Sequence, residues 1–97
     1  MKFVWSDAKA VTNRRKHGVG FEEACSVFLD EDALLVADAD HVAVDDRFVL
    51  LGMSSRLRLL VVVHAYRDHA DELRLISARK ANRLEAAAYA ARRRRTN

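Results

Sequence analysis

Four short segments rich in Leu, Val, Ile and Phe constrain the fold of this chain more than any other feature. They cover residues 33–37, 47–53, 57–66 and 72–79, and clusters of Asp, Ser, Gly or His separate them. Runs of this length and composition are typical of β-strands. Their connections are too short for crossover helices, so we expect neighbouring strands to pair antiparallel in a meander, with residues 52–56 as one turn.

Two helices are predicted before these strands. Ser6 or Asp7 can cap a helix that ends at His17, because Gly18 follows as a stop signal. After the tight joint at residues 18–20, apolar residues recur at helical spacing and predict a second helix. These apolar residues are Phe21, Ala24, Cys25 and Phe28. Residues 3–5 form a short extended segment that we do not count among the strands.

The last part of the chain predicts a third helix. From residue 80 to residue 95 the composition changes to Ala, Arg, Leu and Glu, which favour helices. The expected apolar stripe of this helix consists of Ala81, Leu84, Ala88 and Ala91. The fold class is therefore α+β: two N-terminal helices, a four-stranded antiparallel sheet and a C-terminal helix, with the helices packed on one face of the sheet. We expect one domain over residues 1–97, with a frayed Arg-rich tail at residues 92–97.

Several protein classes lose support. The longest run of Leu, Val and Ile, residues 59–63, is far shorter than the roughly 20 residues of a membrane-spanning helix, and no signal-peptide-like stretch follows Met1. We therefore expect a cytoplasmic protein that does not bind membranes. Cys25 is the single cysteine, which excludes an intrachain disulfide and a cysteine-rich zinc site. No Gly-rich phosphate loop or nucleophile elbow is present, and we predict no cofactor.

Charge is strongly segregated along the chain. Residues 1–20 carry 5 basic and 1 acidic side chains, residues 21–46 carry 0 and 9, and residues 47–97 carry 12 and 4. An ordinary surface of mixed sign would also account for these charges. The basic C-terminal half is nevertheless suited to a polyanion, and nucleic acid is the first candidate.

The densest group of polar residues lies at residues 74–80, where the last strand meets the last helix. In a regular strand Ser77 and Arg79 share one face while Arg74 takes the other, and the helix brings Lys80 and Arg83 nearby. Guanidinium groups match phosphate oxygens with two parallel hydrogen bonds, so this junction could hold an RNA phosphate. Alternatively, the arginines pair with the acidic middle segment.

Histidines provide further candidates. His17 could transfer protons or could simply interact with the end of the first helix. A metal site is a weaker hypothesis, because the spacing of its possible ligands matches no familiar motif. These possible ligands are His64, Asp68, His69 and Asp71. Glu85 and Tyr89 are four residues apart and share a helix face, where such a pair is more often structural than catalytic.

Ordered blocks along almost the whole chain resemble the BrnT family. The first block contains Trp5, Lys9, Asn13, Lys16-His17-Gly18, Phe21, Ala24 and Phe28. The later blocks contain Asp46-Arg47-Phe48, Gly52, Arg74, Ile76-Ser77-Ala78-Arg79-Lys80-Ala81, Glu85 and Tyr89. The resemblance implies a RelE-like fold and a ribonuclease toxin of a type II toxin–antitoxin system. It also implies neutralisation by a BrnA-like antitoxin with a ribbon-helix-helix domain, through which the complex would contact operator DNA.

The leading hypothesis is therefore a metal-independent endoribonuclease that inhibits translation and forms a hetero-oligomer with its antitoxin. Its candidate catalytic residues are His17, Arg47, Arg74, Ser77 and Arg79, and its candidate RNA-binding residues are Lys80 and Arg83. The alternative is a non-catalytic module that binds nucleic acid or a protein partner through electrostatic affinity alone. Charge segregation supports both hypotheses equally. An acidic strand edge near Asp45 and Asp46 could also attract a basic antitoxin segment.

Overall fold

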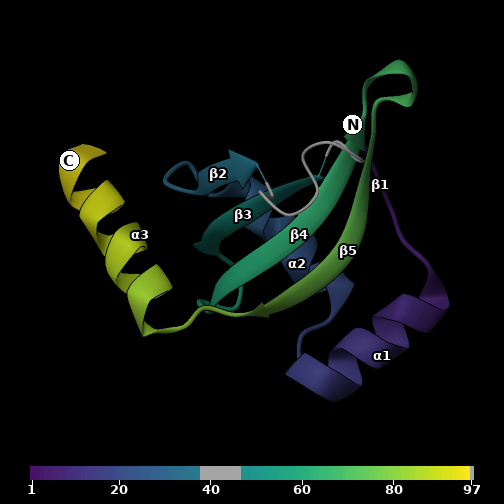
Figure 1. Ribbon diagram of the computed structural model, residues 1–97, viewed down its shortest axis with the longest axis horizontal. Coiled ribbons are helices and arrows are strands. Elements are labelled where there is room, and N and C mark those ends of the chain that lie inside the picture. The colour runs from purple at the N-terminus through teal and green to yellow at the C-terminus, as the bar shows by residue number, and fades with distance from the viewer. Residues whose placement is uncertain (38–46, 97) are drawn as a thin grey trace.

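The computed structural model describes residues 1–37 and 47–96, in which three helices surround a five-stranded sheet of order β1-β5-β4-β3-β2 (Figure 1). The strands are β1 (Lys2–Val4), β2 (Leu34–Ala37), β3 (Arg47–Met53), β4 (Leu59–Arg67) and β5 (Glu72–Lys80). The helices are α1 (Asp7–His17), α2 (Phe21–Ser26) and α3 (Arg83–Thr96), with the short 3-10 helices η1 (Val27–Leu29) and η2 (Asp68–Ala70). No helix among the described residues is long and apolar enough to cross a membrane.

Most of the predicted elements are confirmed. The four predicted strands are β2 to β5, which pair antiparallel as a meander. Ser6 caps α1, and Gly18 ends it in the left-handed conformation at a φ of 68°. The prediction of four strands missed β1, whose three residues pair in parallel with Glu72, Leu73 and Arg74 of β5. Three residues carry no periodic signal of their own, and this pairing joins two distant parts of the chain.

One side of the sheet carries the larger core, and we call it the helix face. Its buried strand residues are Leu50, Leu60, Val62, Leu73, Leu75 and Ala78, which pack with Val19, Phe21, Ala24 and Val27 from the α2 region. Gly52 lies on this face beneath η1, where an added Cβ would stand 2.8 Å from a Val27 methyl group and 2.9 Å from the Ala33 Cβ. The close approach of η1 to β3 therefore requires glycine.

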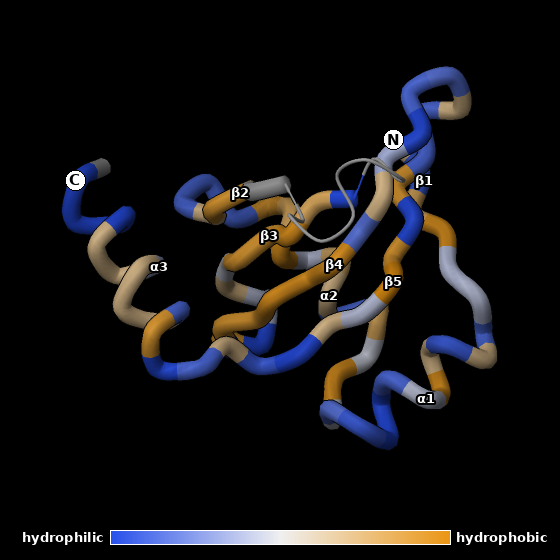
Figure 2. Tube along the Cα trace, in the orientation of Figure 1, coloured by the Kyte–Doolittle hydropathy of each residue, from blue (hydrophilic) through white to orange (hydrophobic). Residues whose placement is uncertain are grey.

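The other side of the sheet, which we call the arginine face, carries Leu51 and Val61 and, as shown below, Arg47, Arg74 and Arg79. In Figure 2, β3 and most of β4 are orange, whereas the C-terminal end of α3 is blue and α1 alternates between blue and paler segments. Tyr89 of α3 packs with Leu51 and Val61 in a second core cluster. The expectation that all helices cover one face is therefore wrong, because α2 and η1 already fill the helix face.

The predicted apolar stripe of the last helix is wrong for Leu84 and Ala88, which are exposed, whereas Ala81 packs against the second core cluster. Leu84 is 83% exposed, whereas Tyr89 is buried. The Tyr89 hydroxyl donates a 2.6 Å hydrogen bond to Oδ2 of Asp30, which also accepts from the Met53 amide at 2.8 Å. Burial and this hydrogen bond raise the pKa of Tyr89 to about 12, so it remains a donor. Tyr89 thus attaches α3 to the rest of the fold. The arginines at residues 92–95, which were expected to lie in a frayed tail, belong to this helix.

Asn13 joins α1 to the sheet. The parallel strand β1 pairs with β5 only as far as Arg74, so the second half of β5 lies beyond its end. There the buried Asn13 side chain accepts from the Ala78 amide at 3.0 Å and donates to the Ala78 carbonyl at 2.8 Å. Its Nδ2 also donates to the Val19 carbonyl at 3.0 Å. The amide therefore makes the two hydrogen bonds that a neighbouring strand would have made.

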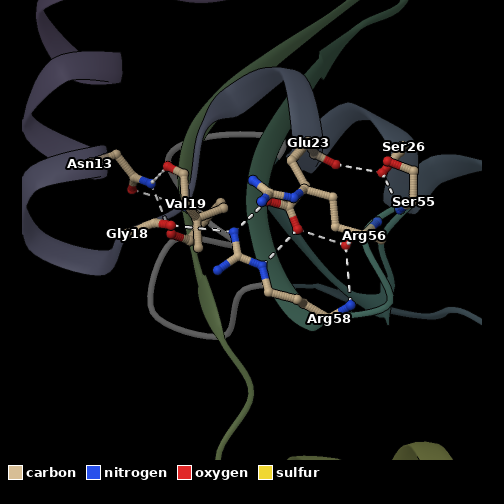
Figure 3. Close-up of polar contacts among 10 residues, drawn as sticks. Asn13, Gly18, Val19, Glu23, Ser26, Ser55, Arg56 and Arg58 are labelled. Atoms are coloured by element: carbon tan, nitrogen blue, oxygen red, sulfur yellow. Dashed lines mark hydrogen bonds and ion pairs between the residues drawn. The ribbon is translucent and has the colours of Figure 1, made fainter.

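A buried carboxylate connects the helical region to the β3–β4 turn (Figure 3). Glu23 on α2 accepts from the guanidinium of Arg58, at 2.9 Å from Nε, and from the Ser54 hydroxyl at 2.7 Å. Arg58 also donates to the Gly18 carbonyl at 3.3 Å. Hydrogen bonds from Arg58 and Ser54 outweigh the effect of burial and lower the pKa of Glu23 from 4.5 to about 2. Glu23 therefore stays ionised and braces the α1–α2 joint.

Replacing Asn13 should destabilise the fold markedly. Asn13→Ala leaves three buried backbone groups without their partner, and we expect a loss of about 3 kcal/mol in the free energy of unfolding. Asn13→Asp should cost more, because a carboxylate cannot donate to the Ala78 and Val19 carbonyls. Urea denaturation measures both losses. The neighbouring exposed variant Thr12→Ala is the control, and equal stability of Asn13→Ala and this control would contradict the role of Asn13.

Glu23 predicts a defined pH dependence of stability. Its pKa is lower in the folded state, so its contribution is complete above pH 4.5 and disappears as the pH falls towards 2. The difference in unfolding free energy between the wild type and Glu23→Gln should therefore shrink over this range, by up to about 3 kcal/mol. Denaturation at several pH values checks this. A constant difference between pH 5 and pH 2.5 would show that Glu23 carries no such linkage.

Candidate functional site

A β-bulge in β5 decides which residues form the candidate site. Val63 of β4 pairs with Ser77, but the next residue, His64, pairs with Leu75, so Ile76 is an extra residue without a partner on β4. The buried residues Leu75 and Ala78 keep to the helix face on either side of it. The strand therefore changes phase at Ile76.

The phase change corrects the expectation that Arg74 lies opposite Ser77 and Arg79. Arg74, Ser77 and Arg79 pair with Ala65, Val63 and Val61, which alternate along β4 and therefore share one face. Arg47 joins them, because it pairs with Ala65 from the other neighbouring strand. The structure thus gathers four of the five predicted catalytic residues on the arginine face: Arg47, Arg74, Ser77 and Arg79.

The arginines on this face differ in their partners. Arg79 donates two 2.8 Å hydrogen bonds to the two carboxylate oxygens of Glu85, at the start of α3. Hydrogen bonding from Arg79 lowers the pKa of Glu85, which makes this carboxylate a poor proton acceptor at neutral pH. The Nε atom of Arg74 is buried and has no hydrogen-bond partner among the described residues. The alternative considered for Arg79 was an ion pair with the acidic middle segment; its carboxylate partner in the structure is Glu85.

Glu85 also caps α3. Its Oε1 accepts from the Asn82 amide at 2.8 Å, and the Asn82 side chain accepts from the Glu85 amide at 2.8 Å. This reciprocal pair is a capping box with asparagine as the N-cap residue. It fixes the first turn of α3 and holds the Glu85 carboxylate where it can bind Arg79. Helix α3 begins at Arg83, three residues later than predicted, because β5 continues to Lys80.

Ser77 belongs to a second feature as well, a groove between α1 and β5. The groove has a volume of about 330 Å³ and is lined by Lys9, Thr12, Asn13, Lys16, His17, Ile76 and Ser77, together with Ala8. We call it the α1–β5 groove. His17 and Ser77 are thus brought to the same groove, while the arginines lie on the sheet face. Ser77 connects the two parts of the site.

Other predicted residues lie apart from this arrangement. Lys80 and Arg83 are exposed at the β5–α3 junction. The possible metal ligands do not converge, because His64 is buried at 4.8 Å from the Phe28 ring, whereas Asp71 pairs with the Met1 amino group at 3.1 Å. The described residues contain no group of three or more His, Cys, Asp or Glu side chains that could hold a metal ion. Asp45 and Asp46 lie outside the described residues.

Sequence reasoning did not assign Lys9, Thr12 and Lys16 to the site. Their spacing of three and four residues places them on one side of α1, and this periodicity is visible in the sequence. It does not show that this side faces β5. Asn13, between them, determines that orientation through its bonds to Ala78.

The fold and the site together define a small α+β domain with arginines on one face of its sheet and further cationic and polar side chains along the α1–β5 groove. The family model described as the ribonuclease toxin BrnT of type II toxin-antitoxin systems matches residues 5–85. The 1.1 Å crystal structure of the Brucella abortus ribonuclease toxin BrnT is similar, with a TM-score of 0.68 and 27% sequence identity. That match covers 86% of this chain and 99% of the Brucella chain. A comparison with curated proteins gives no match.

The chain therefore belongs to the BrnT family of toxins of type II toxin–antitoxin systems. The sequence resemblance to this family is confirmed, and so is the fold class that it implied, with β1 as an additional strand. Membership also implies an antitoxin as a partner.

Glu85 should contribute to stability through two separable interactions. Glu85→Gln removes the charge that pairs with Arg79 but keeps a capping-box side chain, so we expect a loss of about 0.5 kcal/mol. Glu85→Ala removes both interactions and should cost about 1.5 kcal/mol. Thermal or urea unfolding distinguishes the two variants. The exposed Glu22→Gln is the control, and equal losses in the two Glu85 variants would mean that the capping interaction contributes nothing.

Proposed function

We propose that this chain is a metal-independent endoribonuclease whose reacting phosphate lies against β5 beside Ser77. The bulge at Ile76 carries this proposal, because it places Arg74 on the same face as Ser77, Arg79 and the Arg47 side chain of β3. Ser77 in turn lines the α1–β5 groove together with His17. A phosphate at this position has cations on one side and a group able to transfer protons on the other.

The proposed reaction uses the RNA's own 2′-hydroxyl as the nucleophile. Its oxygen attacks the adjacent phosphorus, a base accepts the hydroxyl proton, and the bond from phosphorus to the 5′-oxygen breaks. The leaving oxygen takes up a proton, so that the products are a 2′,3′-cyclic phosphate and a 5′-hydroxyl. The transition state carries more negative charge on the phosphoryl oxygens than the substrate does. Fixed cations therefore accelerate the reaction.

The residues divide this work in the proposal. Arg74 and Arg79 stabilise the developing charge, with Arg79 held in place by Glu85. Arg47 binds the RNA from the next strand but one, and Lys80 and Arg83 extend the cationic surface towards α3. His17 is the candidate for proton transfer, because histidine can accept and donate a proton near neutral pH. Glu85 is unsuited to that task because Arg79 lowers its pKa.

The chemistry of the donor set supports metal independence. The side chains gathered on the arginine face are guanidinium groups and a serine hydroxyl, and the α1–β5 groove adds lysines and one imidazole. Guanidinium and ammonium groups have no lone pair for a metal ion and repel it electrostatically. Carboxylates, which bind divalent cations in two-metal nucleases, are absent from the groove's lining, and Glu85 is engaged by Arg79.

The partners follow from the family. A BrnA-like antitoxin with a ribbon-helix-helix domain would form a hetero-oligomer with this chain and contact operator DNA, so that the toxin itself need not bind DNA. Release from the antitoxin would free the toxin to cut RNA and thereby stop translation. The proposal rests on the match over residues 5–85 to a family of type II toxins.

Expression with and without the adjacent small gene tests the proposal. Induction of the chain alone should arrest growth and degrade RNA, and the neighbour's product should bind the toxin and restore growth. The purified toxin should cut RNA in excess chelator. Arg74→Ala should lower the cleavage rate about 10²-fold or more, since it removes a cation that acts on the transition state. His17→Gln should lower the rate by a similar factor.

Arg56→Ala is the matched control, because Arg56 is exposed in the turn between β3 and β4 and lines a depression with Arg14 and Glu22 of the helical region. It should cut RNA at the wild-type rate. Intact RNA with purified wild type would reject the enzymatic function in favour of a non-catalytic binding module. Cleavage that stops in chelator and returns with a divalent metal would reject metal independence alone.

A further inference from the structure

The α1–β5 groove contains more cationic groups than the proposed reaction uses. Lys9 and Lys16 both line it, seven residues apart on α1, with Thr12 between them. At the rise of an α-helix these two lysines are about 10 Å apart along the axis, a length over which a polynucleotide strand carries several phosphates. Among the described residues neither lysine forms a salt bridge that would offset its charge; the salt bridges there involve Met1, Arg58, Arg79 and Arg93 instead.

The groove is continuous with the proposed site. Ile76 and Ser77 form its β5 wall, and His17 lies at the end of α1 where Gly18 stops the helix. From there Lys16, Thr12 and Lys9 lead away along the helix towards its N-terminus. A strand whose reacting phosphate lies beside Ser77 can therefore continue along α1. Asn13, at the base of the groove, holds its two walls together.

The lining also indicates which part of a nucleic acid the groove can bind. Its polar side chains are lysines, a threonine, an asparagine, a histidine and a serine, and its apolar side chains are Ala8 and Ile76. Apart from His17, to which the proposed function assigns proton transfer, the lining contains no aromatic residue on which bases stack. The Asn13 amide is already occupied by the backbone of Ala78 and Val19. Ammonium and hydroxyl groups bind phosphate and sugar, which carry no sequence information.

We infer that the α1–β5 groove binds the backbone of the RNA strand next to the cleaved bond, through Lys9, Thr12 and Lys16. This inference rests on the proposed function for the position of the reacting phosphate. It goes further in assigning a second, sequence-independent contact to α1. The groove sets how tightly long RNA is held, while the choice of cleavage site is made elsewhere.

Binding of a non-cleavable 2′-O-methyl RNA strand tests the inference independently of catalysis. In a titration by fluorescence anisotropy at several salt concentrations, Lys9→Ala/Lys16→Ala should bind about tenfold more weakly at low salt. The slope of log K against log salt should become shallower by about 1.4, because two phosphate contacts to a single strand are lost. The loss should be the same for strands of different sequence.

Arg14→Ala/Arg15→Ala is the matched control, because it removes two cations from the opposite side of the same helix, where Arg14 and Arg15 line a different depression. This control should keep most of the affinity and the wild-type slope. Equal weakening by both double variants would reduce the effect to net charge and overturn the inference. Unchanged RNA binding in Lys9→Ala/Lys16→Ala, with or without weaker binding of the antitoxin, would overturn it too.

Cleavage kinetics separate this inference from the proposed function. The double variant should cut a dinucleotide at the wild-type rate but show a raised KM for long RNA, since a dinucleotide does not reach along α1. If the wild type cuts no RNA, the proposed function fails, and the anisotropy titration still decides whether the groove binds a strand. Circular dichroism should show the same helix content and melting temperature for all variants.

Discussion

The hydrogen bonds of one amide side chain join α1 to β5, the two elements that border the candidate site. Asn13 makes with Ala78 the pair of bonds that a further strand would have made, and it ties the α1–α2 joint to the same point through Val19. A full strand along the second half of β5 would fill the space now taken by the α1–β5 groove. A side-chain amide satisfies the same backbone groups from one point and leaves the neighbouring edge at Ile76 and Ser77 accessible. The groove exists because the Asn13 side chain, and not a neighbouring strand, makes the hydrogen bonds to the backbone of Ala78.

The two faces of the sheet are stabilised by different means. The helix face has a continuous apolar core in which η1 lies so close to β3 that Gly52 has no room for a side chain. The arginine face has a much smaller core, and α3 is held there chiefly by directed polar contacts, from Tyr89 to Asp30 and from Glu85 to Arg79. A face stabilised in this way can carry charged residues beside its apolar patch. The arginines therefore lie on the face opposite the larger apolar core and do not interrupt its packing.

The local signals in the sequence predicted the elements well. The end of α1 at Gly18, the four strands of the meander and the third helix all depend on residues close to one another. The features missed were those that join distant residues. The parallel pairing of Lys2–Val4 with β5 joins residues about 70 positions apart, so no local signal in the sequence predicts it. Likewise, Leu84 fits the apolar stripe of α3 better by composition than Tyr89 does, but Asp30 offers a partner to the tyrosine.

The candidate site was predicted in composition and not in geometry. The dense run at residues 74–80 correctly indicated Arg74, Ser77 and Arg79 as neighbours, but strict alternation placed Arg74 on the wrong face. The spacing of the core residues contains a signal for the bulge. Leu73 and Leu75 are two residues apart, as in a regular strand, but the next core residue is Ala78, three residues after Leu75. Such a break in period predicts a bulge. The lysines of α1 could be grouped by spacing, yet their direction depends on Asn13, which sequence alone does not orient.

The bulge has a consequence for how β5 of this chain tolerates a change in length. Leu73, Leu75 and Ala78 lie on the helix face, and Arg74, Ser77 and Arg79 lie on the arginine face. If Ile76 were deleted, the side chains from Leu73 to Arg79 would therefore alternate between the two faces without interruption. The core residues and the arginines would keep their sides, and only the bend of β5 beside α1 would change. A single codon gained or lost at this position therefore offers evolution a way to reshape the wall of the groove while leaving the rest of the sheet in register.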